Sequence, residues 1–228
     1  MLRPGRPFTM VENIQSQTKT SHVISFNDNE RLFGFDGKNR KARFPKQVLT
    51  YMHFYLGKTL SDKRITEFME NFFISYDVEE DEQRSVINFK VNFNGEAKVY
   101  HIEEIFGMTF RYIKFLADKF SKTNIRDCVV TVPAFFGFKE RLAMQNAIAL
   151  SGLDPLSFVN ENVAAAVHYF MDKKVNATQN LIFYNMGSSF TQAALVRFST
   201  DVETVKDSKV EHKNIHVTDI LLYLLIIY

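Results

Sequence analysis

Apolar and polar residues alternate at several places in the first half of the chain, which is typical of half-buried strands. Residues 21–27 predict one short strand and residues 32–34 a second, with a turn of asparagine and aspartate between them. Residues 85–93 carry apolar side chains on one face, and Asn94-Gly95 predicts a tight turn into a partner strand over 97–101. The first half is therefore expected to contain a β-hairpin.

Two other segments of the first half follow different patterns. After Pro45, residues 47–56 show helical spacing of apolar side chains, and Gly57 predicts the end of that helix. Residues 78–84 are strongly charged, which predicts a solvated loop rather than a metal site.

The second half alternates helical patterns with short apolar runs. Helices are predicted over 103–120 and 139–151, and from Asn160 to about Met171, and strands over 125–132, 158–159, 180–184 and 191–198. Pro133 closes the first of these strands, and Gly152 stops the second helix. This order indicates an α/β domain with a mixed sheet, and the best internal boundary falls near residue 103.

Composition narrows the class of protein. With 228 residues, of which 46% are hydrophobic, the chain can form a real core. A net charge of +2 gives no general attraction to nucleic acid or anionic lipid. The single cysteine, Cys128, excludes an internal disulfide and a cysteine-clustered zinc site, and its apolar neighbours favour a buried structural thiol. The six histidines show no metal-ligand spacing, so no metal site is predicted.

The two ends of the chain show no membrane or targeting signal. The first residues lack the apolar segment of a signal peptide. Residues 220–228 are nine apolar residues, well short of the roughly 20 that span a bilayer. A buried strand or helix, or a tail foreign to the fold, is the favoured interpretation of that run.

Three short stretches carry the chemical signal: Val130–Phe136, Val159–Ala166 and Phe183–Ser189. Their order and spacing, with Arg141 eight residues after Pro133, resemble the ATPase domain of the heat shock protein 70 superfamily. The likeness covers about residues 1–200 and is closest to the large, divergent branch of heat shock protein 110 and the hypoxia up-regulated proteins. It implies an α/β, actin-like (ribonuclease H-like) ATPase fold of two lobes, with ATP and magnesium in the cleft between them.

The resemblance also divides the chain. It implies that residues 1–103 are the outer subdomain of lobe I, 104–174 part of its inner subdomain, 175–200 the opening hairpin of lobe II, and 201–228 a divergent tail. The chain then corresponds to the first lobe and the start of the second, truncated at both ends. The family's first phosphate-binding hairpin and its later glycine-rich phosphate loop have no counterpart, and glycine is scarce at nine residues.

The resemblance assigns roles to several polar residues. Lys38 matches the lysine that reaches the γ-phosphate and the attacking water, although a solvated lysine is its simpler interpretation. Glu161 matches the glutamate that orients water around magnesium; the alternative is a carboxylate that is merely favourable in the first turn of a helix. Asn185, Gly187, Ser188 and Ser189 match the nucleotide-binding turn of the second hairpin.

Departures from the family pattern argue against hydrolysis. The family hairpin has an aspartate at each of two positions where this chain has Asn185 and Gln192. An amide keeps the size of the side chain and loses the charge that ligates magnesium-bound water or assists proton transfer. A conventional ATP-hydrolysing chaperone would need both aspartates. Asn162 also replaces the proline that usually follows the glutamate.

Two residues that match family positions, and one glycosylation triplet, indicate roles outside the nucleotide site. Pro133 and Arg141 match residues that relay the nucleotide state to the substrate-binding domain, and a strand terminator and a solvated helix arginine are the alternatives. Asn176-Ala-Thr178 is an N-glycosylation triplet, which agrees with a lumenal protein.

Taken together, the sequence predicts a partial nucleotide-binding domain of an endoplasmic-reticulum chaperone or nucleotide-exchange co-chaperone, with the cytoplasm as the alternative location. The intact parent would bind ATP or ADP with magnesium and turn it over slowly or not at all, and this chain would hold neither tightly. The expected partners are a conventional heat shock protein 70 and unfolded clients, without nucleic acid or a membrane span. A nucleotide-independent module that docks another chaperone is the second hypothesis, and enzymatic activity stays open.

Overall fold

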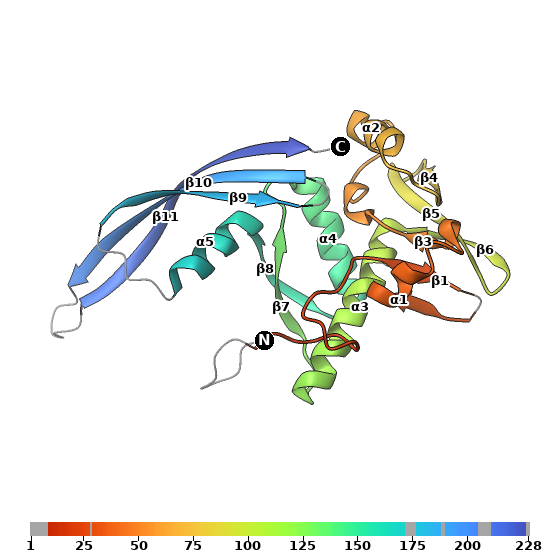
Figure 1. The fold of residues 1–228 in the computed structure, drawn as a ribbon, viewed down its shortest axis with the longest axis horizontal. Coiled ribbons are helices and arrows are strands. Elements are labelled where there is room, and N and C mark those ends of the chain that lie inside the picture. The colour runs from red at the N-terminus through yellow and green to blue at the C-terminus, as the bar shows by residue number, and fades with distance from the viewer. Residues whose placement is uncertain (1–8, 28, 172–176, 188–189, 205–210, 227–228) are drawn as a thin grey trace. The chain divides into compact units, whose positions relative to one another are not determined.

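The computed structural model describes residues 9–27, 29–171, 177–187, 190–204 and 211–226, with side chains for residues up to 199 except 190. The chain divides into two compact units (Figure 1). The first unit contains residues 1–129 and 137–157, and the second contains residues 130–136 and 158–228.

The elements follow one another in a mixed α/β order. In the first unit they are β1 (Ile24–Phe26), β2 (Arg31–Phe33), α1 (Gly34–Asn39), the 3₁₀ turn Pro45–Gln47, β3 (Val48–Leu49), the 3₁₀ turn Met52–Phe54, α2 (Lys63–Asn71), β4 (Asp77–Asp81), β5 (Val86–Phe93), β6 (Glu96–His101), α3 (Ile102–Ser121) and α4 (Phe138–Leu150). The second unit has α5 (Glu161–Met171), β9 (Gln179–Met186), β10 (Phe190–Thr204) and β11 (Glu211–Ile226). The paired strands β7 (Asp127–Val132) and β8 (Asp154–Asn160) contribute residues to both units.

The predicted β-hairpin is confirmed as β5 and β6, which pair antiparallel and join β4 in a three-stranded sheet. Asn94 and Gly95 have φ of 56° and 75°, as the tight turn between these strands requires. The apolar face of β5 contributes Ile87, Phe89 and Val91 to the core. The two short strands predicted at the start are also confirmed, since β1 pairs with β2 on one side and β3 on the other.

The predicted helix over 47–56 is wrong. Val48 and Leu49 instead form β3, which pairs with Ser25 and Ile24 of β1. Tyr51 has a left-handed φ of 57°, which a helix does not allow, and the helical structure around it consists of the short 3₁₀ turns Pro45–Gln47 and Met52–Phe54. Its apolar side chains are buried as a helix would bury them, so their spacing alone could not distinguish the two structures.

The charged segment 78–84 is a strand over most of its length rather than a loop. Its first residues form β4, an edge strand, in which Glu79 lies across from Asn88 and its carboxylate pairs with Lys90 at 2.5 Å. An edge strand with both faces partly in water accommodates charged side chains, so its sequence lacks the hydropathy pattern of a strand.

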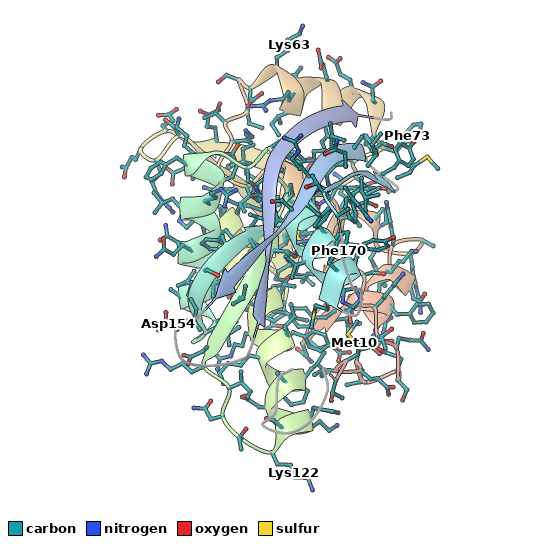
Figure 2. The ribbon with its side chains drawn as sticks, turned by 90° about the vertical axis from the view of Figure 1, so that its left-hand side faces the viewer. Met10, Lys63, Phe73, Lys122, Asp154 and Phe170 are labelled. Atoms are coloured by element: carbon teal, nitrogen blue, oxygen red, sulfur yellow. The ribbon has the colours of Figure 1, made fainter. Side chains whose placement is uncertain are left out.

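Figure 2 shows Lys63 at the start of α2 and Phe73 just after its end, both pointing into solvent.

Helices α3 and α4 match the predicted positions and pack against each other within the first unit. Gly107 on α3 allows this approach, because a Cβ there would lie 3.2 Å from the carbonyl oxygen of Ala147 on α4. The first turn of α4 also contacts the loop after the second 3₁₀ turn. Lys58 forms an ion pair with Glu140, and Glu140 accepts a hydrogen bond from the backbone N–H of Gly137 at 3.1 Å.

Gly57 brings this loop against α4, and we expect Gly57→Ala to lower the free energy of unfolding by about 2 kcal/mol. Its φ is +66°, and a Cβ would lie 2.8 Å from the backbone nitrogen of Glu140, which cannot move away as a flexible side chain could. Gly95→Ala is the matched control, because Gly95 has a φ of +75° but no atom within 4 Å of such a Cβ. Urea titrations should give about 1 kcal/mol for the control, from the backbone strain alone. Equal losses in the two variants would contradict the close contact.

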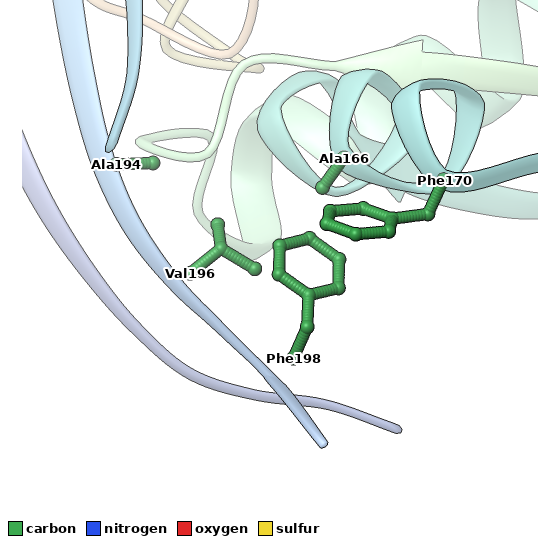
Figure 3. Packing of buried hydrophobic residues seen from close by; sticks show 5 residues of the cluster. All are labelled: Ala166, Phe170, Ala194, Val196 and Phe198. Atoms are coloured by element: carbon green, nitrogen blue, oxygen red, sulfur yellow. The ribbon is translucent and has the colours of Figure 1, made fainter. Parts of the chain in front are cut away.

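The second unit is built on the antiparallel sheet β9–β10–β11 with α5 against it (Figure 1). The core between them contains Ala166, Phe170, Ala194, Val196 and Phe198, and the rings of Phe170 and Phe198 lie 3.6 Å apart between centroids (Figure 3). The strands predicted over 180–184 and 191–198 are therefore confirmed and extended. The apolar run near the C-terminus forms part of β11 as far as Ile226, in agreement with the strand alternative.

Within the described ranges, no helix is long and apolar enough to span a membrane.

Candidate functional site

Glu161 and Gln192 form the centre of a polar cluster at the start of α5. Glu161 is the first residue of α5, and Gln192 lies on β10 with no exposed surface. The Gln192 side-chain amide donates a hydrogen bond to the Glu161 carboxylate at 3.0 Å, and its oxygen accepts one from the Asn162 amide at 3.3 Å. Asn162 is itself only 3% exposed. We call Glu161, Asn162 and Gln192 the amide clamp, since both ends of the Gln192 amide are engaged.

Asn185 lies beside this clamp. It faces Gln192 across the β9–β10 ladder, and directly opposed residues of an antiparallel pair lie on the same face of a sheet. Asn185 and the following Gly187 are exposed. The structure therefore brings together Glu161, Asn185 and Gln192, whereas Ser188 and Ser189 lie outside the described residues.

Lys38 lies in the first unit, near the C-terminal end of α1, where its side chain is exposed. Glu161 belongs to the second unit, and the role of Lys38 at the γ-phosphate stays a prediction. A short helix with an exposed lysine in its last turn is also what the simpler interpretation of Lys38 requires.

Pro133 and Arg141 also lie in different units. Pro133 is buried directly after β7, and its carbonyl oxygen accepts a hydrogen bond from the backbone N–H of Phe136 at 3.0 Å. Arg141 is in the first turn of α4, where its backbone N–H donates to Gly137. The end of the strand at Pro133 is confirmed, and the relay role of the two residues stays a prediction.

The remaining candidates add no reactive group. Burial, together with the nearby carboxylates of Asp154 and Asp127, raises the pKa of the half-buried Cys128 thiol, which makes it a poor nucleophile. Asn176 lies outside the described residues. Among the residues that the structure describes, no three His, Cys, Asp or Glu side chains converge as metal ligands would.

Comparison with known proteins identifies the family. The model of the Hsp70 protein family matches residues 3–213, which is most of the chain. The chain belongs to the Hsp70 family. Its sequence is 38% identical over 203 residues to hypoxia up-regulated protein 1 of Xenopus laevis, covering 88% of this chain and 31% of that protein. It is 36% identical over 203 residues to the Danio rerio protein of that name and 33% identical over 201 residues to the human one, covering 88% and 87% of this chain and 20% of each relative.

These findings confirm both the superfamily and the branch that the motifs indicated. The Hsp70 family implies an actin-like ATPase fold, and the observed mixture of helices and small sheets is consistent with it. The chain spans between a fifth and a third of the length of these curated relatives.

The hydrogen bonds of the amide clamp are not apparent from the sequence motifs. The sequence marked position 162 only as a lost proline and position 192 only as a lost aspartate. The structure shows that the two amides hydrogen-bond to each other, with Gln192 also donating to Glu161. The sequence signal for the clamp is that amides replace the usual residues at both positions 162 and 192, and that Glu161 lies directly before the first of them.

The cluster fits a phosphate-bearing ligand better than a directly bound metal ion. It has one carboxylate and two buried amides, with the exposed Asn185 beside them. Amides can donate to phosphate oxygens and accept from metal-bound water, but a divalent cation that binds protein directly prefers several carboxylate oxygens. Among these residues, Glu161 and the exposed Asn185 could contact such a ligand, and the buried Gln192 would support Glu161.

Proposed function

We propose that this chain is part of an Hsp70-type nucleotide-binding domain whose parent binds ATP or ADP with magnesium and hydrolyses it slowly or not at all. The observation that carries the proposal is the amide clamp: the Glu161 carboxylate is held by the neutral Gln192 amide instead of lying beside an aspartate. When bound, the magnesium nucleotide would supply the phosphates and an activated water. Glu161 and Asn185 would then orient that water and the phosphates through hydrogen bonds.

The clamp opposes hydrolysis for two physical reasons. An amide cannot accept a proton at neutral pH, so Gln192 offers no general base. It also occupies one Glu161 oxygen with a hydrogen bond, which leaves that carboxylate less able to reorient toward water. Binding needs neither a base nor a second negative charge, so nucleotide binding can persist where hydrolysis is lost.

The division of the chain belongs to the same proposal. Residues 1–103 are assigned to the outer subdomain of lobe I, 104–174 to part of its inner subdomain, 175–200 to the opening hairpin of lobe II, and 201–228 to a divergent tail. The antiparallel pairing of β9 and β10 around residues 179–198 supports the hairpin assignment. Lys38 would face the γ-phosphate from lobe I, and Pro133 and Arg141 would relay the nucleotide state.

For the parent we propose a stress-responsive chaperone of the endoplasmic-reticulum lumen that acts on unfolded clients and as an exchange factor for a conventional Hsp70. The similarity to hypoxia up-regulated protein 1 over 88% of the chain supports this role. The Asn176 triplet supports a lumenal location, because N-glycosylation takes place on lumenal segments.

Calorimetry with magnesium ATP and ADP tests the nucleotide proposal on the full chain, with circular dichroism to show that it is folded. Because glycine, which phosphate-binding loops require, makes up only nine of the 228 residues, we expect a dissociation constant above about 100 μM. Tight binding with turnover would overturn the argument from the clamp. Tight binding without turnover would keep the clamp and show that this chain needs no further phosphate loop.

The second candidate is a nucleotide-independent module that docks another chaperone, and the neutral amides at 185 and 192 favour it. Titrating the folded chain with a purified conventional Hsp70, with and without nucleotide, separates the two candidates. Equal affinity in both conditions supports the docking module, whereas binding that requires nucleotide supports the first proposal.

A further inference from the structure

A groove in the first unit, far along the chain from the amide clamp, combines arginine and aromatic side chains. It has a volume of about 550 Å³ and is lined by Asn29, Glu30 and residues of β2, the end of β5 and α3. We call it the α3 groove. Its principal lining side chains are Arg31, Phe33, Phe93, Met108, Arg111 and Tyr112.

Arg31, one of the lining residues, contacts two aromatic rings. Its guanidinium carbon lies 5.0 Å from the ring centre of Phe93 and 5.7 Å from that of Tyr100, within the range of cation–π attraction. Its Nη2 also donates a hydrogen bond to the Tyr100 hydroxyl at 3.3 Å. These contacts use the faces of the guanidinium and one N–H, so its remaining donors can reach a ligand.

The groove is also lined by an aromatic platform and a second arginine. The rings of Phe33 and Tyr112 stack with centroids 4.8 Å apart and planes within 4°. Met108, Arg111 and Tyr112 lie at positions i, i+3 and i+4 of α3, which places them on neighbouring parts of one helix surface. Arg111 is exposed and makes no ion pair with any residue that the structure describes.

The charges select the kind of ligand. Two arginines and one glutamate line the groove, so its described lining has a net charge of +1. That charge matches a ligand with one negative charge, such as a single carboxylate, rather than the several negative charges of a nucleoside triphosphate. Arginine, phenylalanine, tyrosine and methionine are the residue types enriched at the centres of protein interfaces.

We propose that the α3 groove docks a segment of a partner polypeptide that presents one carboxylate beside an aromatic side chain. The carboxylate lies between the guanidinium groups of Arg31 and Arg111 and accepts charge-assisted hydrogen bonds from them. The neighbouring ring packs against Met108 and the Phe33–Tyr112 platform. This site is independent of nucleotide binding and of the amide clamp.

Nuclear magnetic resonance on the ¹⁵N-labelled full chain tests the site, with N-acetyl-Glu-Phe-amide as the probe. We expect saturable shifts of the Arg31 and Arg111 side-chain N–H signals, with millimolar affinity for so small a ligand. The neutral analogue N-acetyl-Gln-Phe-amide should bind at least fivefold more weakly. Equal binding of the two probes, or the absence of any saturable shift, would overturn the proposal.

Arginine variants give the second arm of the experiment. Arg111→Gln should weaken the charged probe about tenfold, as expected for the loss of a charge-assisted contact, without disturbing an exposed helix position. Arg126→Gln is the matched control, because Arg126 is also exposed but does not line the groove. The affinity of this variant for the charged probe should equal that of the unsubstituted chain. An unchanged affinity of Arg111→Gln for the charged probe would contradict a carboxylate-bearing peptide as the ligand. So would a titration in which ATP shifts the same N–H signals at lower concentration than the peptide does.

Discussion

Replacing Lys58 by methionine is expected to lower the free energy of unfolding by about 3 kcal/mol, because it leaves the Glu140 carboxylate partly buried without its cation. The side chains of Lys58 and Glu140 are only 16% and 10% exposed. Burial opposes ionisation of Glu140, but the contacts with Lys58 and the backbone outweigh it and hold the pKa of that carboxyl below its ordinary value. Methionine keeps most of the aliphatic volume of lysine, so the loss reports chiefly on the charge.

Lys63→Met is the matched control for this ion pair. Lys63 pairs with Glu67 at 3.4 Å on α2, but its side chain is 88% exposed, so water screens the interaction. We expect a change below about 0.5 kcal/mol in urea titrations. The difference in the free energy of unfolding between the two variants should become smaller in acid. The pKa of Glu140 is depressed in the folded chain, and protonation below that pKa removes the charge that Lys58 stabilises. Similar losses in the two lysine variants at neutral pH would show that the buried pair carries no special weight.

Lowering the pH from 7 to 5 is expected to reduce the free energy of unfolding by about 3 kcal/mol through His22 and His53. Burial, with a smaller effect of the charge of His53, lowers the pKa of His22 from 6.5 to about 4, and burial lowers that of His53 to about 4 as well. Both imidazoles stay neutral in the folded chain, whereas the unfolded chain takes up protons below about pH 6.5. Stability is therefore complete above that pH and is lost as the pH falls toward 4.

The magnitude follows from about 1.4 kcal/mol per pH unit for each imidazole between these limits, reduced because part of each ring meets water. His22 packs edge-on against Phe106 at 4.7 Å, and its Nε2 atom is buried without a hydrogen-bond partner in the described part of the chain. His22→Leu should therefore remove about half of the pH dependence. Unfolding at pH 7.5 provides the internal control, since both states are then neutral at this position and any difference reflects packing. If the free energy of unfolding of the variant depends on pH between 7 and 5 as steeply as that of the unsubstituted chain, His22 is excluded as a source of the pH dependence.

The fold could be predicted best where one local rule agreed with the tertiary structure. The turn at Asn94-Gly95 and the helices over 102–121, 138–150 and 161–171 follow from turn chemistry and periodicity, and the structure confirms them. Segment 47–56 failed because the pairing of Val48 and Leu49 with β1 depends on residues more than 20 positions away, which periodicity does not register. Edge strand β4 was not predicted because both of its faces are partly solvated and carry charged side chains, so it lacks the apolar alternation of a strand.

The candidate site was predictable to a similar degree. The order of the motifs selected Glu161, Asn185 and Gln192 as candidates. It also assigned the chain to the Hsp70 family, and the family comparison confirms that assignment. It did not reveal that Gln192 joins Glu161 to Asn162, because that contact requires α5 and β10 to pack together through Phe170 and Phe198. The sequence predicted no binding role for Arg31 or Arg111, because the α3 groove depends on contacts between β2 and α3 that no motif records.

The ion pair between Lys58 and Glu140 also has a kinetic consequence. Its partners are 82 residues apart, so the pair must close a long loop, whereas hairpins such as β5–β6 form between neighbouring segments. We therefore expect the pair to be absent from the folding transition state. Lys58→Met should then accelerate unfolding in stopped-flow experiments and leave the refolding rate nearly unchanged, whereas slower refolding would place this contact early. The lifetime of the folded first unit, rather than the speed of its formation, thus depends on one lysine in a loop.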